Sequence, residues 1–290
     1  MSKCISSINH IFTKKVLNEL LDTGTSDVYD YVIQRFTTDA ESKTNGELIS
    51  EIYVRLADEY RNEYYYINTL LNKLLIGIHS VNTTTALSQV RIADHIADFV
   101  MINGEGCVYE IKSDLDNLDR LTEQIKDYYK AFSKVSVLAA ENEFEHVKHM
   151  LSRLGETGDY VGLYVLSNND TIFNHSISRE PQLWNENLNH KCLFNLLRKR
   201  EYESVLLSYF GIVPTVAPVF YYKACLEQFS EIPILIAQQL VFKELKNRNR
   251  ISMSTFKSIP KELRSVFYFS DLQKKLPQLA VFLQRPYQGR

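Results

Sequence analysis

Two carboxylates and a lysine lie on neighbouring apolar stretches near the middle of the sequence. Asp98 interrupts the run IADFVMI, and Glu110 and Lys112 lie in the run CVYEIK. Both runs have the composition of β-strands, which we expect at residues 95–102 and 107–112. Side chains two apart on a strand point to the same face, so Glu110 and Lys112 are expected to face one way.

A buried carboxylate in an apolar strand is costly unless it is paired or bound to a cation. Two carboxylates on paired strands repel each other, and a divalent cation relieves that repulsion. Mg²⁺ takes oxygen ligands, commonly one or two carboxylates, and keeps water and substrate phosphate in its other positions. Asp98 and Glu110 are therefore the candidate metal ligands. Lys112 is the candidate catalytic residue, acting on the attacking water or offsetting charge on a phosphate.

A structural role is the alternative for each of these residues. Asp98 could cap a turn, and Glu110 and Lys112 could form a solvent-facing pair on an edge strand. A single Glu-x-Lys pattern is abundant in proteins. The combination of an aspartate strand, a tight turn, a Glu-x-Lys strand and a following helix is much more specific.

The turn and capping residues of the sequence predict the strands and helices that must position these residues. Asn103-Gly104 in the stretch NGEG indicates a hairpin turn at residues 103–106, because both residues tolerate positive φ. A helix is expected from about Leu115 to Phe132, capped by Asp114 or Asp116. Within it Arg120, Gln124 and Tyr128 lie four apart and share a face.

Further strands are expected in the stretch that runs through Arg91 and at residues 134–139 and 160–166, with a helix at 143–154 and an edge strand at 171–178. Strands and helices in this order predict an α/β fold, a mixed β-sheet core flanked by helices. Helices are expected upstream at residues 11–21, 28–36 and 47–76, the last broken near 60–62. Downstream, helices are expected at residues 192–200, 201–210, 221–229 and 234–247.

Polar and Pro-rich stretches suggest three domains. These are an N-terminal helical segment (1–45), a sheet-containing domain (46–180) and a helical C-terminal domain (181–290). Residues 181–290 hold 16 Lys/Arg and 8 Asp/Glu, a balance of +8, whereas residues 1–180 hold 17 and 27, a balance of −10. The split favours an acidic metal-binding half joined to a basic half that faces a polyanion. Basic helices that merely solvate a surface are an equal alternative.

The motif Asp98…Glu110-Ile111-Lys112 resembles the core motif of the PD-(D/E)XK nuclease superfamily, which has the restriction-endonuclease-like fold. The stretch YEIKSDLDNLDRLTEQIKDYYKAFSKVSVL is similar to an uncharacterised bacterial and phage-borne family within that superfamily. The resemblance covers roughly residues 47–166, and Ala97 stands where the superfamily's name expects proline.

This resemblance implies a nuclease that depends on Mg²⁺ or Mn²⁺ and hydrolyses phosphodiester bonds in DNA. It assigns metal binding to Asp98 and Glu110 and catalysis to Lys112. It also places Gln124 and Tyr128 beside the site. A glutamate on an upstream helix often completes such sites, and Glu63 is our assignment with Glu51 in reserve.

Two further readings of function stay open. A catalytically silent nuclease-fold module would bind DNA or a protein partner, for example in phage defence or a mobile element. A protein-interaction scaffold would use the helical half to dock a partner, and a homodimer or an unidentified protein partner fits either reading. Among enzyme motifs, no Walker loop, GxGxxG motif or Ser/His/Asp arrangement is present in the sequence.

The cellular compartment can be predicted from the cysteine spacing, the N-terminal stretch and the longest charge-free run. The four cysteines are far apart, which argues against a zinc site and a disulfide scaffold, and the polar start MSKCISSINHIFTKK lacks the apolar core of a signal peptide. The longest charge-free run, 204–222, is broken by Gly211, Pro214 and Pro218, so we expect it to be buried core and not a membrane span. A cytoplasmic protein without a membrane partner is the expectation.

Overall fold

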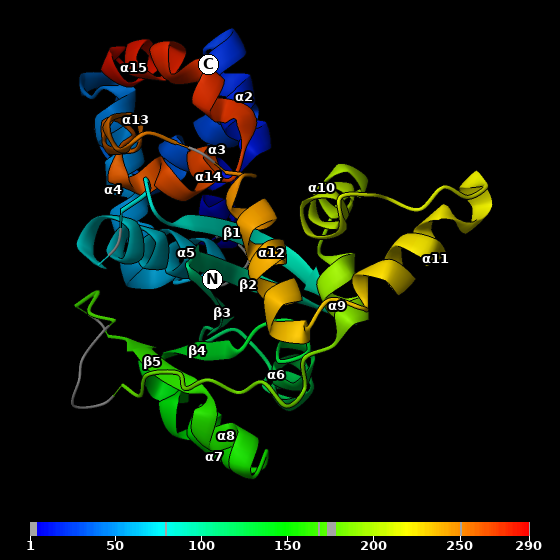
Figure 1. The fold of residues 1–290 in the computed structure, drawn as a ribbon. Coiled ribbons are helices and arrows are strands. Elements are labelled where there is room, and N and C mark those ends of the chain that lie inside the picture. The colour runs from blue at the N-terminus through cyan, green and yellow to red at the C-terminus, as the bar shows by residue number, and fades with distance from the viewer. Residues whose placement is uncertain (1–4, 79, 168, 173–177, 250, 290) are drawn as a thin grey trace. The chain divides into compact units, whose positions relative to one another are not determined.

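The computed structural model describes residues 5–289 except 79, 168, 173–177 and 250. The chain forms two compact units, one made of residues 1–78 and 251–290 and the other of residues 79–250 (Figure 1). These limits differ from the domain boundaries expected at 45/46 and 180/181. The reason is that the last forty residues pack with the N-terminal helices, whereas the helices before them pack on the sheet.

The described residues of the first unit form helices and the segments that connect them. Its α-helices are α2 (Lys14–Thr23), α3 (Asp27–Phe36), α4 (Asn45–Glu59), α5 (Glu63–Asn72), α13 (Met253–Ser258), α14 (Arg264–Tyr268) and α15 (Leu276–Gln284). Thr44 and Glu47 form a capping box that starts α4, and the chain between α4 and α5 breaks at residues 60–62 as the sequence predicts. The buried Asn45 side chain donates to the carbonyls of Phe282 and Arg285, which ties the C-terminal segment to α4.

The second unit contains a five-stranded mixed sheet. Its strands are β1 (Thr85–Ile92), β2 (His95–Asn103), β3 (Glu105–Lys112), β4 (Lys134–Ala140) and β5 (Gly162–Leu166). They lie in chain order, with β2 antiparallel to both β1 and β3, and with β4 and β5 parallel to β3. The predicted mixed α/β core flanked by helices is confirmed.

Glycine closes the hairpin between β2 and β3 and admits a close packing contact beside it. In the predicted turn at 103–106, only Gly104 has positive φ, at 76°. A Cβ on Gly106 would lie 2.6 Å from Phe242 and 2.8 Å from Phe132, so a larger residue would push these rings away. The hairpin therefore depends on glycine at two positions for two different reasons.

Helix α6 (Leu121–Tyr128) is shorter than predicted. The helix was expected to start near Leu115, but Asp116 caps no helix; its carboxylate accepts from both the backbone N and the hydroxyl of Ser113. Asn117 and Asp119 form similar local bonds: the Asn117 side-chain amide donates to the Asp119 carboxylate, and the backbone N of Asp119 donates to Asn117 Oδ1. Such local side-chain bonds offer the backbone an alternative to helix, which explains why the helix starts late.

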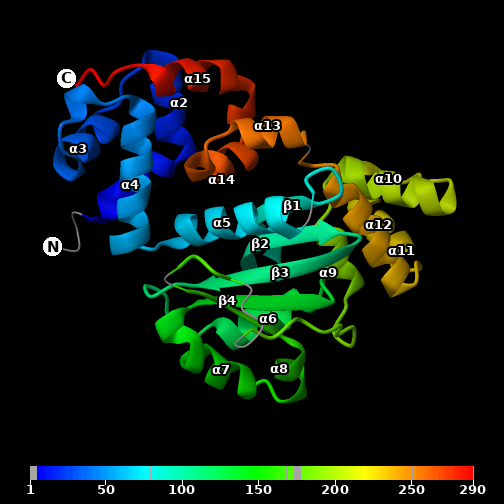
Figure 2. The ribbon, with the colours of Figure 1, turned by 90° about the vertical axis from the view of Figure 1, so that its left-hand side faces the viewer.

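The remaining helices of the second unit are α7 (Phe144–Ser152), α8 (Glu156–Tyr160), α9 (His190–Asn195), α10 (Lys199–Phe210), α11 (Pro218–Phe229) and α12 (Ile234–Lys246). Figure 2 shows α6, α7 and α8 along one side of the sheet. The buried core joins Val100, Val108 and Val137 of the sheet to Ile125 of α6 and Phe242 of α12. One face of the sheet is thus packed against α6, from the middle of the unit's sequence, and α12, from near its end.

One sequence expectation for this unit is wrong, and another falls mainly outside the described residues. The charge-free run 204–222, expected to be buried core, is largely exposed, and all six residues from Thr215 to Phe220 are exposed. The predicted edge strand at 171–178 falls mainly on residues outside the described part of the chain.

Within the described residues, the structure contains no helix of the length and apolar character that a membrane span requires.

Candidate functional site

The carboxylate of Glu110 is held by three side chains on the covered face of the sheet. Lys112 Nζ donates to Glu110 Oε1 at 2.9 Å, and Gln124 Nε2 donates to the same oxygen at 2.6 Å. Tyr128 donates from its hydroxyl to Glu110 Oε2 at 2.6 Å. Gln124 Oε1 also accepts from Lys112 Nζ at 3.0 Å, which closes the ring of contacts. We call these four residues the Glu110 network.

The network is buried. Glu110 is 1% exposed and Lys112 6%, so neither charge is solvated by bulk water. A buried ion pair is tolerated only when geometry and additional hydrogen bonds are good, and here Gln124 and Tyr128 supply those bonds. The two helix residues are four apart, and the structure brings both onto Glu110, where the sequence placed them.

Tyr128 is the buried end of the network. Its hydroxyl also lies 3.0 Å from the carbonyl of Ile96 on β2. Burial raises the pKa of Tyr128 far above its ordinary value, and the negative charge of Glu110 adds to this effect. The phenol therefore stays neutral near pH 7 and donates its hydrogen bond to Glu110.

Asp98 faces the same side of the sheet from the neighbouring strand. The β2–β3 register pairs Phe99 with Tyr109, and one further step places Asp98 opposite Glu110. There the ladder opens, and Asp98 Oδ2 accepts from the backbone N of Ile111 at 2.8 Å in place of a main-chain partner. The predicted pair of carboxylates on adjacent strands is thus assembled, with Asp98 half-buried and Glu110 fully buried.

The upstream glutamates belong to the other compact unit. Glu63 is the first residue of α5, and Glu51 lies on α4, where it accepts from Lys43 Nζ at 2.7 Å. The geometry of the Glu110 network is complete without either residue. The assignment of Glu63, with Glu51 in reserve, stays a prediction.

A second polar cluster beside the network was not predicted. Asp127 Oδ2 lies 2.6 Å from His95 Nδ1 and accepts from the backbone N of Asp94 at 3.2 Å. Its other oxygen accepts from Lys130 Nζ at 2.6 Å. Burial opposes ionisation, but the bonds from Lys130 and His95 outweigh it and lower the pKa of Asp127. We call these residues the Asp127 cluster; the Asp-x-x-Lys spacing at the end of α6, with Lys130 just beyond the helix, was the signal available for it.

A metal ion would take the two carboxylates of this site. Among the described residues, no group of three or more His, Cys, Asp or Glu side chains is gathered as metal ligands usually are. Asp98 and Glu110 nevertheless form a two-carboxylate donor set of the kind that suffices for Mg²⁺, which completes its shell with water. Both Glu110 oxygens are already hydrogen-bonded, so a bound cation would replace at least one of these donors.

The two compact units do not reproduce the charge asymmetry between residues 1–180 and 181–290. The unit of residues 79–250 holds 18 Lys/Arg and 22 Asp/Glu, a balance of −4. The other unit holds 15 and 13, a balance of +2. The basic residues of 181–290 are divided between two units, so no compact unit corresponds to the expected basic half.

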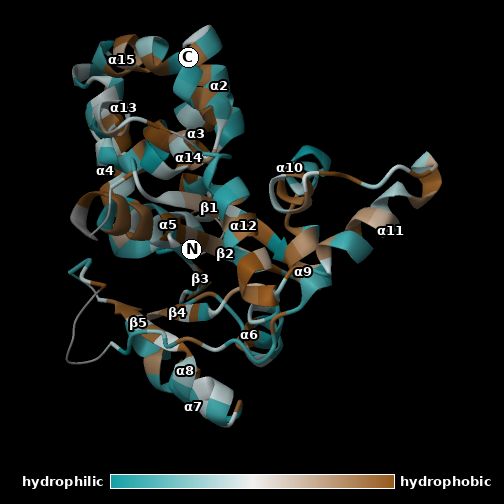
Figure 3. Cartoon of the chain, in the orientation of Figure 1, coloured by the Kyte–Doolittle hydropathy of each residue, from teal (hydrophilic) through white to brown (hydrophobic). Residues whose placement is uncertain are grey.

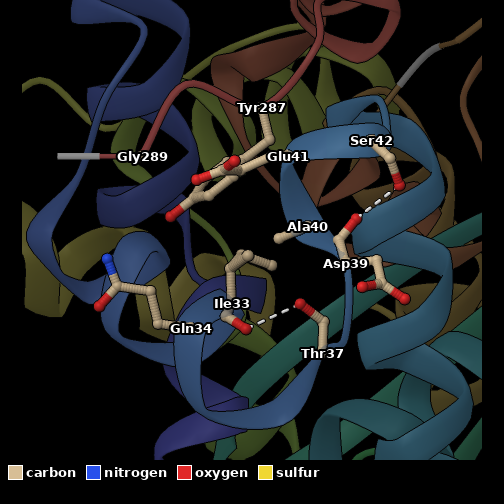
Figure 4. Close-up of a pocket in the computed structure, with 9 residues that line it drawn as sticks. All are labelled: Ile33, Gln34, Thr37, Asp39, Ala40, Glu41, Ser42, Tyr287 and Gly289. Atoms are coloured by element: carbon tan, nitrogen blue, oxygen red, sulfur yellow. Dashed lines mark hydrogen bonds between the residues drawn. The ribbon is translucent and has the colours of Figure 1, made fainter.

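A hollow of about 630 Å³ lies in the first unit, and its lining residues are distant in sequence from the Glu110 network and the Asp127 cluster (Figure 4). It is lined by Asp39, Glu41, Tyr287 and parts of α3. The hydroxyl of Thr37 donates to the carbonyl of Ile33 at 2.7 Å. None of the predicted site residues lines it.

Fold and site together define a mixed α/β protein with a buried carboxylate–lysine network on the third strand of its sheet. The family model of bacteriophage P4 protein cII matches residues 56–267, and the chain belongs to this family. It is similar to Protein cII of Enterobacteria phage P4, with 27% identity over 163 residues. That match covers 56% of this chain and 58% of the phage protein. No solved structure matches the chain.

The family match includes the whole of the sheet-containing unit. Residues 56–267 contain Asp98 and the four members of the Glu110 network, and also Glu63. The association with phages was among the expectations from the sequence, but neither match bears on the PD-(D/E)XK superfamily. The family's name carries no statement about catalysis.

Proposed function

We propose that this chain is a metal-dependent nuclease of the PD-(D/E)XK type, which hydrolyses phosphodiester bonds in DNA. The observation that carries the proposal is the Glu110 network, with Asp98 opposite it on the neighbouring strand. The order of the elements supports a restriction-endonuclease-like fold. An antiparallel hairpin carries the acidic residues, and α6 leads to a strand parallel to β3.

Each residue of the site has a part in the proposed reaction. Asp98 and Glu110 would hold Mg²⁺ or Mn²⁺, which supplies an activated water and stabilises negative charge on the phosphate. Gln124 and Tyr128 fix the orientation of the Glu110 carboxylate. Lys112 uses two of its N–H donors on Glu110 and Gln124. We assign its third donor to the scissile phosphate or the attacking water.

The test is cleavage of supercoiled plasmid, single-stranded DNA and RNA with Mg²⁺ or Mn²⁺. Glu110→Gln and Asp98→Asn should each lower the rate by at least about 100-fold, since both remove a charged ligand. Asp127→Asn is the matched control, because it neutralises another carboxylate that accepts three hydrogen bonds nearby. Equal rates in the wild type and the two site variants would remove the assignment.

The predicted helix glutamate is tested in the same assay. Glu63→Gln should slow cleavage, whereas Glu51→Gln should weaken the pair with Lys43 and leave cleavage unchanged. The reverse pattern would reassign the helix glutamate to Glu51. Because the two residues lie on successive helices of one unit, both variants also report on any general loss of stability.

One observation favours a second candidate function, a catalytically silent module that binds DNA or a protein partner. Both oxygens of Glu110 are engaged by the protein's own side chains, so the network is stable as a structural ion pair. Calorimetric titration with Mn²⁺ separates the two candidates. DNA binding with no heat from Mn²⁺ and no cleavage would favour the silent module.

A further inference from the structure

The residue that lies opposite Asp98 on β1 has an unusual backbone conformation. Figure 3 shows β1 next to β2, and β1 is an edge strand of the sheet. The β1–β2 register pairs Ser88 with Phe99, and one further step places Gln89 opposite Asp98. Gln89 has φ 53°, which is in the left-handed region. A left-handed residue thus adjoins a candidate metal ligand on the neighbouring strand.

This conformation is not explained by a turn. Of the four non-glycine residues with positive φ in the described part of the chain, only Gln89 lies within a strand; Asp39, Ala93 and Asp170 lie outside the strands. Left-handed backbone is unfavourable for a residue with a Cβ, and Asn and Asp tolerate it better than other types. Such strain persists only where the surrounding structure enforces it, and it is concentrated at functional sites.

The left-handed residue belongs to a row that crosses three strands. The registers place Gln89, Asp98 and Glu110 opposite one another on β1, β2 and β3. Residues directly opposite in antiparallel strands project to the same face, with Cβ atoms about 4.5–5.5 Å apart. An extended residue at position 89 would therefore place its side chain beside the Asp98 carboxylate. The left-handed backbone departs from that geometry, and Gln89 is exposed whereas Asp98 is half-buried.

The carboxylate of Asp98 is thus bordered by backbone on both sides. On the β3 side, Asp98 Oδ2 accepts from the backbone N of Ile111 at 2.8 Å. On the β1 side, it faces the left-handed backbone of Gln89. Groups that orient a metal ligand matter for binding, because their loss typically lowers metal affinity about 10–100-fold.

We propose that Gln89 is a positioning residue for Asp98. Its left-handed backbone, and not its side chain, keeps Asp98 in the orientation that accepts from Ile111 and leaves the carboxylate open to a divalent cation. Gln89 acts through Asp98 and contacts no reacting atom. The positioning of Asp98 stands on the fold alone, whereas the effect on metal binding rests on the proposed function.

Four substitutions of Gln89 separate its backbone from its side chain. Gln89→Gly and Gln89→Asn remove or shorten the side chain but accommodate positive φ. Gln89→Pro excludes positive φ, because the ring fixes φ near about −65°, and proline is tolerated on edge strands. Gln89→Val also disfavours the left-handed region and keeps the backbone N–H, which proline lacks.

The experiment measures amide hydrogen exchange at Ile111 by NMR and Mn²⁺ affinity by calorimetry. Gln89→Pro and Gln89→Val should exchange at least about tenfold faster at Ile111, because its acceptor is displaced. They should also bind Mn²⁺ about 10–100-fold more weakly. Gln89→Gly and Gln89→Asn should match the wild type in both. Ala93→Gly, at the other left-handed residue of this hairpin, is the control and should change neither value.

Circular dichroism melting reports whether each variant is folded, and Gln89→Val alone decides if Gln89→Pro does not fold. Wild-type exchange at Ile111 in Gln89→Val would overturn the proposal, since an effect of proline alone would come from its missing N–H. Equal losses in Gln89→Gly and Gln89→Val would overturn it too, because the side chain would then be responsible. Faster exchange at Ile111 in Gln89→Val, with no Mn²⁺ binding by the wild type, would support the positioning and contradict the proposed nuclease.

Discussion

Two carboxylates on or beside α6 each accept three hydrogen bonds, yet their surroundings differ. Glu110 accepts from Lys112, Gln124 and Tyr128, and its cationic partner Lys112 has a side chain only 8% exposed. Asp127 accepts from Lys130, His95 and a backbone N–H, but the side chain of Lys130 is 41% exposed. One cluster keeps both charges out of water, and the other leaves its cation solvated.

This difference in solvation separates the Glu110 network, a candidate functional site, from the Asp127 cluster, which has a structural role. Burying both charges costs free energy that a hydrophobic pair would avoid, so retention of the Glu110 network suggests a use beyond stability. The Asp127 cluster joins α6 to the start of β2 with charges that remain partly solvated. This connection alone explains the role of the Asp127 cluster.

Removing the cation from the Glu110 network should have the largest effect. Lys112→Ala leaves a buried carboxylate without its counter-charge, and we expect about 3–5 kcal/mol loss in the free energy of unfolding. Urea denaturation at pH 7 measures it. The double variant Glu110→Met/Lys112→Met should recover most of that stability while remaining inactive as a nuclease. If Lys112→Ala costs no more than Lys130→Ala, the contrast between the two clusters is wrong.

Removing a neutral donor should have an intermediate effect. Tyr128→Phe deprives Glu110 of one hydrogen bond, at a cost of about 1–3 kcal/mol. Tyr129→Phe is the matched control, because the buried Tyr129 hydroxyl has no hydrogen-bond partner among the described residues and its loss should be neutral. The Tyr128 pKa is raised, so its contribution should be constant up to about pH 10, the value of an unfolded tyrosine. A larger loss for Tyr129→Phe would contradict this.

Weakening the Asp127 cluster should have the smallest effect on the free energy of unfolding, and this effect should depend on pH. Asp127→Asn should cost about 1 kcal/mol at pH 7, as for partly exposed ion pairs. A lowered pKa stabilises the folded state above the unfolded value, about 3.9, and the gain is lost as pH falls through the folded pKa. The difference between Asp127→Asn and wild type should therefore shrink below about pH 4. Glu123→Gln, on an exposed residue of the same helix, should show no such trend.

Local sequence patterns predicted much of the sheet and its site. The strand at 95–102, the Gly104 turn and the strand at 107–112 are confirmed within one or two residues, because short apolar runs and turn chemistry are local properties. Helical spacing placed Gln124 and Tyr128 on one face, and the resemblance to nucleases placed them beside the site; their hydrogen bonds to Glu110 are seen only in the structure. The late start of α6 was missed, because short-range bonds of Ser113 and Asp116 compete with the helix.

The sequence by itself determined the strands, most helices and the alignment of Glu110 with Lys112, since these depend on neighbours along the chain. Only the tertiary structure decided which distant segments share a unit, and with it the distribution of charge. It likewise decided that the charge-free run 204–222 is exposed, because burial depends on what packs against a segment and not on its composition. For the same reason, the Asp127 cluster became visible only when α6 was placed against the start of β2.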